Sequence, residues 1–242
     1  MVVESLIHYK VNLKRLYKPF FIYIQFMHSD QIISLSRLSS YFVIVPIIFG
    51  LISKINTNKD FIQIFYLLVF TLLIEIISTL LANRDINNIF VINSFTFFEF
   101  LFVVLFYKRF FDAFKKTHFH FILIALFLCL VIFTTFLANN IKLIDNFSVS
   151  IEAIILIVYA LLAFFIIMKK MVYEDVLSTP FFWINSAVLI YFSGNLFLFI
   201  FSTYLQNHNE SSVYLKLYII HSILNILYYL ILSIAFWKAR KV

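Results

Sequence analysis

Three glutamates and one histidine fall well inside long apolar stretches of this sequence. They are Glu75, Glu99, Glu152 and His221. A charged side chain is costly in a hydrocarbon environment, so such residues usually face a partner or a functional site. Glutamates at these positions could carry protons, act as a general acid and base, or bind a cationic head group. The structural alternative is that each one is neutral or paired and joins neighbouring helices.

Asparagine side chains occur in the same stretches. Asn225 lies four residues after His221, a spacing that places both on one face of a helix. We predict that these polar groups converge on one pocket. The predicted ligand-binding residues are Asn93, Glu99, Glu75, Glu152, Asn195, His221 and Asn225. The candidates for acid–base catalysis among them are Glu99, Glu152 and His221.

The histidines and the cysteine argue against a metal centre. A catalytic zinc site needs about three protein ligands, typically with more than one His or Cys among them. Only His221 lies well inside an apolar stretch, because His118 and His120 fall at the end of another. We therefore predict a hydrogen bond for His221, and neither a metal nor a cofactor. The single cysteine, Cys129, allows no disulfide within the chain.

The composition indicates the class of protein that must position these residues. Of the 242 residues, 63% are hydrophobic and 13% are charged, and the mean hydropathy is +0.99. Apolar runs of about 20 residues are typical of transmembrane helices. A membrane barrel would instead show alternating segments of about 10 residues. The sequence therefore predicts an all-α integral membrane bundle with about seven transmembrane helices.

The predicted spans form one domain, residues 32–242. Their ranges are 32–52, 61–82, 89–107, 119–137, 147–168, 180–201 and 214–237. Pro46 interrupts the first span, and the fourth, almost wholly apolar, is expected to face lipid. Residues 1–31 are a basic segment with three open interpretations: an interfacial helix, a partial span at the Pro19 run, or an upstream extension of a protein that starts at Met27.

The loop charges predict the orientation of the chain, because lysine and arginine accumulate on the cytoplasmic side. Counted from Met27, eleven lie at one end of the bundle: Lys54, Lys59, Lys108, Arg109, Lys115, Lys116, Lys169, Lys170, Lys238, Arg240 and Lys241. Three lie at the other: Arg37, Arg84 and Lys142. We therefore predict an outside N-terminus and an inside C-terminus, with most candidate site residues in the outer half. Because these charges flank spans, the expected partners are membrane lipids, and no nucleic acid.

Residues 93–99 and 182–195 resemble segments of uncharacterised bacterial multi-span membrane proteins. The resemblance would cover the chain from about Met27 onward and implies the membrane class without any activity. The abundance of Phe, Ile, Asn and Lys is typical of an AT-rich bacterial genome. We therefore expect the inner membrane of a bacterium.

Three functions agree with these observations. The leading hypothesis is a receptor-like or accessory protein that binds a small-molecule or lipid ligand in a polar pocket of the outer half. An intramembrane lipid-modifying enzyme is the first alternative, with Glu99 or Glu152 as acid or base and His221 as their partner. The second alternative is a proton-coupled carrier. The sequence favours a protein that is not an enzyme.

Overall fold

A computed structural model describes residues 29–54, 60–112, 118–138, 145–170, 175–207 and 211–240. All regular structure within these ranges is helical, so the prediction of an all-α bundle is confirmed. The predicted N-terminal segment, with its Pro19 run and the choice of Met27 as start, lies outside the described residues except for positions 29–31.

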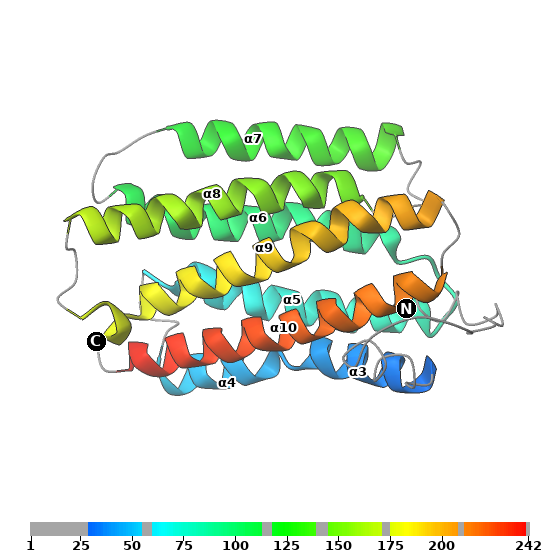
Figure 1. The fold of residues 1–242 in the computed structure, drawn as a ribbon, viewed down its shortest axis with the longest axis horizontal. Helices are drawn as coiled ribbons and strands as arrows, with labels where there is room; N and C mark the ends of the chain where they lie inside the picture. Colours follow the sequence, from blue (N-terminus) through cyan, green and yellow to red (C-terminus); the bar gives the residue numbers. More distant parts are fainter. Residues whose placement is uncertain are drawn as a thin grey trace.

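Successive long helices run in opposite directions along the bundle (Figure 1). The α-helices are α3 (Ser29–Tyr41), α4 (Ile44–Ile52), α5 (Ile62–Ala82), α6 (Ile89–Asp112), α7 (Phe119–Ile132), α8 (Asn146–Lys170), α9 (Pro180–Asn207) and α10 (Ser211–Ala239). A π-helical segment, η2 (Phe133–Ala138), follows α7, and a 3-10 turn, η3 (Val176–Ser178), precedes α9.

Six stretches within the described residues are long and apolar enough to cross a membrane. They are Ser34–Ile52, Ile62–Ala82, Ile89–Asp112, Asn146–Lys169, Pro180–Ile200 and Leu217–Ala239. About 20 residues of helix are needed to cross the hydrocarbon core. The apolar stretch Phe119–Thr135 is shorter and corresponds to the fourth predicted span. The chain is therefore a multi-pass membrane protein.

The first span is divided into α3 and α4 near Pro46. A proline lacks the N–H group that would donate to the carbonyl four residues earlier, and its ring crowds that carbonyl. The carbonyl in question belongs to Phe42, which instead accepts a bond from the Val45 N–H at 3.0 Å. The helix consequently ends at Tyr41 and restarts at Ile44, as the position of this proline predicts.

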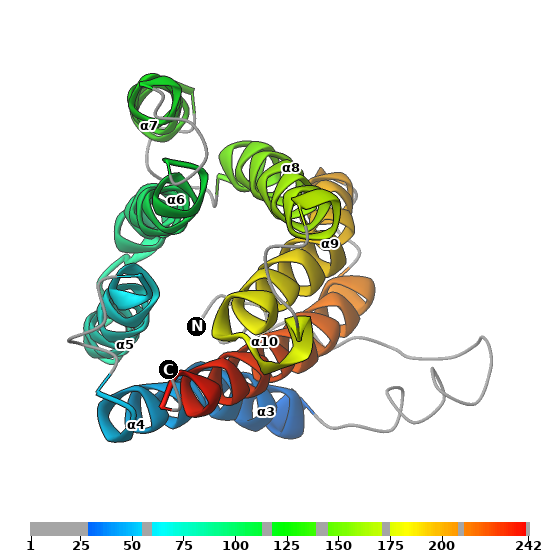
Figure 2. The same cartoon turned by 90° about the vertical axis from the view of Figure 1, so that its left-hand side faces the viewer.

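The six long spans form a closed ring of packed helices, seen along their axes in Figure 2. In order around the ring, α3 and α4 pack on α5, α5 on α6, α6 on α8, α8 on α9, and α9 on α10, which returns to α3 and α4. The short helix α7 packs on α6 outside this ring (Figure 2). The ring is the element of the fold that encloses the candidate site.

The outer surface of α7 is apolar. Its large exposed side chains are Phe119, Phe121, Ile122, Leu126, Leu128 and Ile132. Water would oppose such a surface, whereas hydrocarbon tolerates it. The exposure agrees with a helix whose outer side contacts lipid.

One end of the ring is packed mainly by aromatic and aliphatic side chains. Phe181 stacks on Phe106 and on Phe110, with ring centroids 5.2 and 4.1 Å apart. One set of buried hydrogen bonds joins three helices at this end: the Tyr107 hydroxyl donates to Asn185 Oδ1 at 2.6 Å, and Asn185 Nδ2 donates to the Ala160 carbonyl at 3.1 Å. These bonds link α6, α9 and α8.

Candidate functional site

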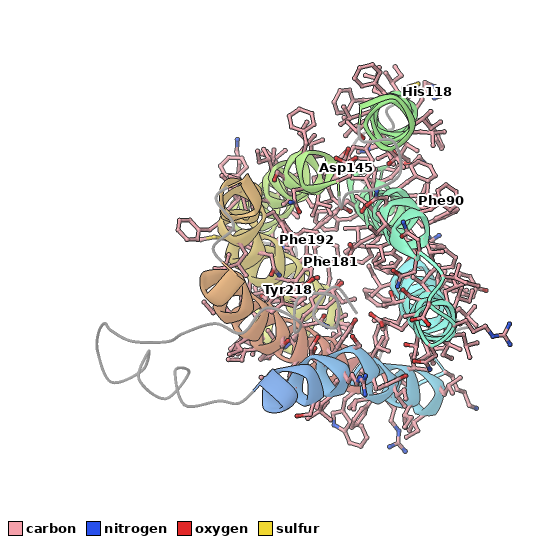
Figure 3. The ribbon with its side chains drawn as sticks, turned by 90° about the vertical axis from the view of Figure 1, so that its right-hand side faces the viewer. Phe90, His118, Asp145, Phe181, Phe192 and Tyr218 are labelled. Carbon is pink, nitrogen blue, oxygen red and sulfur yellow. The ribbon has the colours of Figure 1, made fainter. Side chains whose placement is uncertain are left out.

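A cavity of about 290 Å³ lies inside the helix ring. Helices α5 and α6 form one wall, and α8, α9 and α10 form the other (Figure 3). Its polar lining residues are Thr71, Glu75, Thr96, Glu99, Asn146, Tyr191, Tyr218, His221, Asn225, Tyr228 and Tyr229. The remaining lining side chains are aliphatic or phenylalanine.

The cavity lies in the half of the ring where α6, α8 and α10 begin. Its lining includes Asn146, the first residue of α8, and extends along α10 from Leu217 to Tyr229. Figure 3 labels Tyr218 on α10, on the side of the space between the two walls. The cavity therefore reaches the end of the bundle that the loop charges predict to be outside.

Glu99 lies on the face of α6 that borders the cavity. Ile92, Phe95, Thr96 and Glu99 all line it, and spacings of three and four residues put them on one side of a helix. Within the described chain, no hydrogen bond or ion pair engages the Glu99 carboxylate. This carboxylate is available to a ligand.

Glu75 borders the same cavity from α5. Thr71, one turn earlier, also lines it, and the Thr71 hydroxyl donates to the Leu67 carbonyl at 2.8 Å. Glu75 thus shares with Thr71 the face of α5 that borders the cavity.

Glu152 lies behind the cavity wall. Its residue is 1% exposed, and neither carboxylate oxygen has a hydrogen-bond partner among the described residues. It follows Val149, which lines the cavity, by three residues on α8. The Glu152 and Glu99 carboxylates are close enough to interact electrostatically. Glu152 is therefore coupled to the cavity without bordering it.

His221 is held in one orientation by Asn195. Asn195 Nδ2 donates to the Tyr191 carbonyl at 2.9 Å, which directs its Oδ1 atom to His221 Nδ1 at 2.8 Å. A carboxamide oxygen only accepts, so His221 Nδ1 carries the proton in this bond. Because a neutral imidazole has one N–H, Nε2 is then left as an acceptor. His221 lines the cavity, whereas Asn195 supports it from behind.

Asn225, one turn after His221, also lines the cavity. Its Nδ2 atom donates to the Ser39 carbonyl at 3.4 Å. The predicted stripe of His221 and Asn225 on one helix face is therefore present, and the asparagine also links α10 to α3.

Asn93 is not among the residues that line the cavity. Its Oδ1 atom accepts a bond from the Asp145 N–H at 3.1 Å. Asp145 in turn accepts bonds from the Ser148 N–H at 3.1 Å and from the Thr134 hydroxyl. An aspartate that bonds the N–H three residues later is an N-cap. The structure thus places Asn93 in a cluster that begins α8, instead of in the predicted pocket.

Four tyrosines that line the cavity, Tyr191, Tyr218, Tyr228 and Tyr229, are not among the predicted ligand-binding residues. The rings of Tyr191 and Tyr228 lie 4.6 Å apart between centroids. The Tyr228 residue is 4% exposed, and its hydroxyl has no hydrogen-bond partner among the described residues. The helical spacing of Tyr228 from His221 and Asn225 on α10 could have predicted its place in the site. No comparable spacing pointed to Tyr191 on α9.

No metal centre is evident in the part of the chain that the structure describes. It contains no group of three or more His, Cys, Asp or Glu side chains arranged to hold an ion.

Comparison with protein-family models, with curated proteins and with solved structures finds no match to this chain. The function must therefore be inferred from the geometry and chemistry of the cavity.

Proposed function

We propose that this chain is a receptor-like or accessory membrane protein that binds a small ligand in the cavity of its helix ring. The observation that carries the proposal is the convergence of Glu75 from α5, Glu99 from α6 and His221 from α10 on one cavity. Ligand sites are typically apolar concave spaces of about 300–1,000 Å³ with a few converging polar groups. A volume of about 290 Å³ indicates a small ligand.

A hydroxyl without a partner in the cavity supports a binding role. Tyr228 lines the cavity, and its hydroxyl has no hydrogen-bond partner among the described residues. A buried polar group without a partner costs about 1–3 kcal/mol, and intramembrane ionisable groups usually serve a function. A bound ligand would offset this cost.

We place the cavity in the outer half of the inner membrane of a bacterium. The excess of Lys and Arg after the first, third, fifth and seventh predicted spans supports an inside C-terminus. The cavity borders the opposite ends of the helices. A ligand would then enter from the outer side.

A pair of matched substitutions on α8 tests the proposal. Val149 lines the cavity, whereas Val158 is 48% exposed on the outside of the bundle. Overpacking by a larger side chain costs about 1–3 kcal/mol, so Val149→Phe should lower the retained ligand by about tenfold, and Val158→Phe should not. The measurement is quantitative mass spectrometry of small molecules extracted from the three purified proteins. Equal contents in all three would contradict ligand binding in the cavity.

A lipid-modifying enzyme is the second candidate, favoured by the geometry of His221. Its Nδ1 atom is held by Asn195 at 2.8 Å, which leaves Nε2 as a possible base. A general base needs such an oriented acceptor near the reacting group. Under this alternative, membranes containing the wild-type protein should show turnover of one lipid that is lost in His221→Gln. Identical lipid compositions in the two membranes would exclude this activity.

A further inference from the structure

We propose that the ligand of the cavity is an organic cation, an amine or ammonium group on a small apolar body. This inference rests on the proposed binding function and names the chemical class of the ligand. It follows from the charges, acceptors and aromatic rings of the described lining residues.

The charged lining residues are all acidic. Glu75 and Glu99 are the charged side chains among the described residues that border the cavity, and no described lysine or arginine is part of its lining. Glu152 adds a third carboxylate behind the wall, 1% exposed and without a described hydrogen-bond partner. An anionic ligand would meet carboxylates in a low-dielectric environment, where repulsion between like charges is strong. An organic cation would instead be attracted.

The hydrogen-bonding groups also favour a donor on the ligand. The carboxylates of Glu75 and Glu99 accept only when ionised, and the bond from His221 to Asn195 leaves His221 Nε2 as an acceptor. A protonated amine carries N–H donors and no acceptor, as the lysine ammonium does. Its hydrogen-bonding capacity is complementary to this lining.

Aromatic rings surround the acidic groups. The aromatic lining residues, apart from the imidazole of His221, are Phe95, Tyr191, Phe199, Tyr218, Tyr228 and Tyr229. Aromatic faces attract ammonium groups, by about 2 kcal/mol or more where the cation is desolvated, and aromatic cages are used to recognise them. The same rings accommodate an apolar body. Carboxylates alone would fit a metal ion as well, and the aromatic walls favour an organic cation over a metal ion.

Three six-carbon probes of different charge test the inference: hexylammonium, 1-hexanol and hexanoate. Their Kd values for the purified wild-type protein are measured by isothermal titration calorimetry in the same detergent. We expect hexylammonium to bind at least about tenfold more tightly than hexanol, as a desolvated cation–π contact and a carboxylate imply. Hexanoate should bind most weakly. Equal affinities, a preference for hexanol or hexanoate, or no binding of hexylammonium would overturn the inference.

Charge-neutralising variants test which carboxylate causes the preference for hexylammonium over hexanol. Glu99→Gln should reduce the hexylammonium preference over hexanol by at least about fivefold, whereas Asp85→Asn, in the exposed loop between α5 and α6, should keep it. A preference that persists in a folded Glu99→Gln protein would contradict the assignment. If that variant does not fold, the ranking of the three probes in the wild-type protein still decides. If the three probes do not rank as expected but Val149→Phe still lowers the retained ligand, the cation class is refuted. The proposed binding function then stands.

Discussion

The polar residues of this chain divide into those that hold the bundle together and those that border its cavity. Glu99 and His221 border the cavity, as expected from ionisable groups inside apolar stretches. Asn93 has the same sequence environment but bonds the Asp145 N–H. The sequence does not distinguish a residue that borders the cavity from one that joins two helices, because both are polar residues in a buried turn of helix. The difference depends on which neighbouring helix each residue faces.

Asn93→Ala should lower stability without weakening ligand binding. The substitution leaves the buried Asp145 N–H without the Asn93 Oδ1 acceptor, and interhelical hydrogen bonds in membranes contribute about 0.6–2 kcal/mol. Thermal unfolding in detergent measures the loss, and hexylammonium affinity measures the site. Asn83→Ala, at an exposed position after α5, is the control. An unchanged Tm combined with lost binding would instead assign Asn93 to the ligand.

At the scale of the elements, the helices were predictable and their contacts were not. Continuous apolar runs located the spans, and Pro46 located the division between α3 and α4. The close approach of α9 and α10 at Gly194 was not predicted. A Cβ atom at this position would lie 2.8 Å from Leu224 Cδ1, so the two helices use the missing side chain of glycine to pack. Such a contact depends on the rotation of both helices, which apolar runs leave open.

Gly194→Ala should make a clash between α9 and α10. Leu224 must change its rotamer to make room, at a cost of about 1 kcal/mol, which opposes a gain of about 1 kcal/mol from the higher helix propensity of alanine. Ser193→Ala, at the neighbouring exposed position, should have little effect. In a double-mutant cycle, Leu224→Ala should remove most of the penalty, because the clashing atoms are then absent. Additive losses in Tm-derived free energy would show that the two residues do not meet.

At the scale of the whole molecule, the sequence predicted the membrane class and a polar region toward one end. It did not predict the closed ring, but the fourth span was expected to face lipid, in agreement with the exposed apolar surface of α7 outside the ring. Residues that face lipid and residues that face the ring are similarly apolar, as Ile154 at 49% exposure and the buried Leu156 show. Hydropathy therefore carries little information about helix neighbours in a membrane. Tyr191, on the α9 side of the cavity, could not be predicted for the same reason.

The proposed orientation predicts opposite labelling of the two ends of the ring. Asp85 lies in the loop between α5 and α6, and Arg240 follows α10. In a Cys129→Ser background, Asp85→Cys should react with a membrane-impermeant maleimide added to intact cells. Arg240→Cys should react only after the membrane is opened. Labelling of both positions from the same side would refute the topology, and the reverse pattern would invert the orientation.

The charge and the accessibility of the cavity can be measured together with a Thr96→Cys variant that also carries Cys129→Ser. Thr96 lines the cavity three residues before Glu99. The probes are two methanethiosulfonates of similar size, one with a trimethylammonium group and one with a sulfonate. Asp85→Cys gives the ratio of their rates at an exposed loop, and Ile154→Cys gives the reactivity of a position on the outer, lipid-facing surface.

An accessible acidic cavity predicts that the thiol at position 96 reacts faster than the thiol at position 154. At position 96, the ratio of the rate with the cationic reagent to the rate with the anionic reagent should exceed the same ratio at Asp85→Cys by at least about tenfold. The reason is that the carboxylates attract one reagent and repel the other. A thiol at position 96 that reacts no faster than the one at position 154, or that shows the loop ratio, would contradict a cation-binding cavity in this protein.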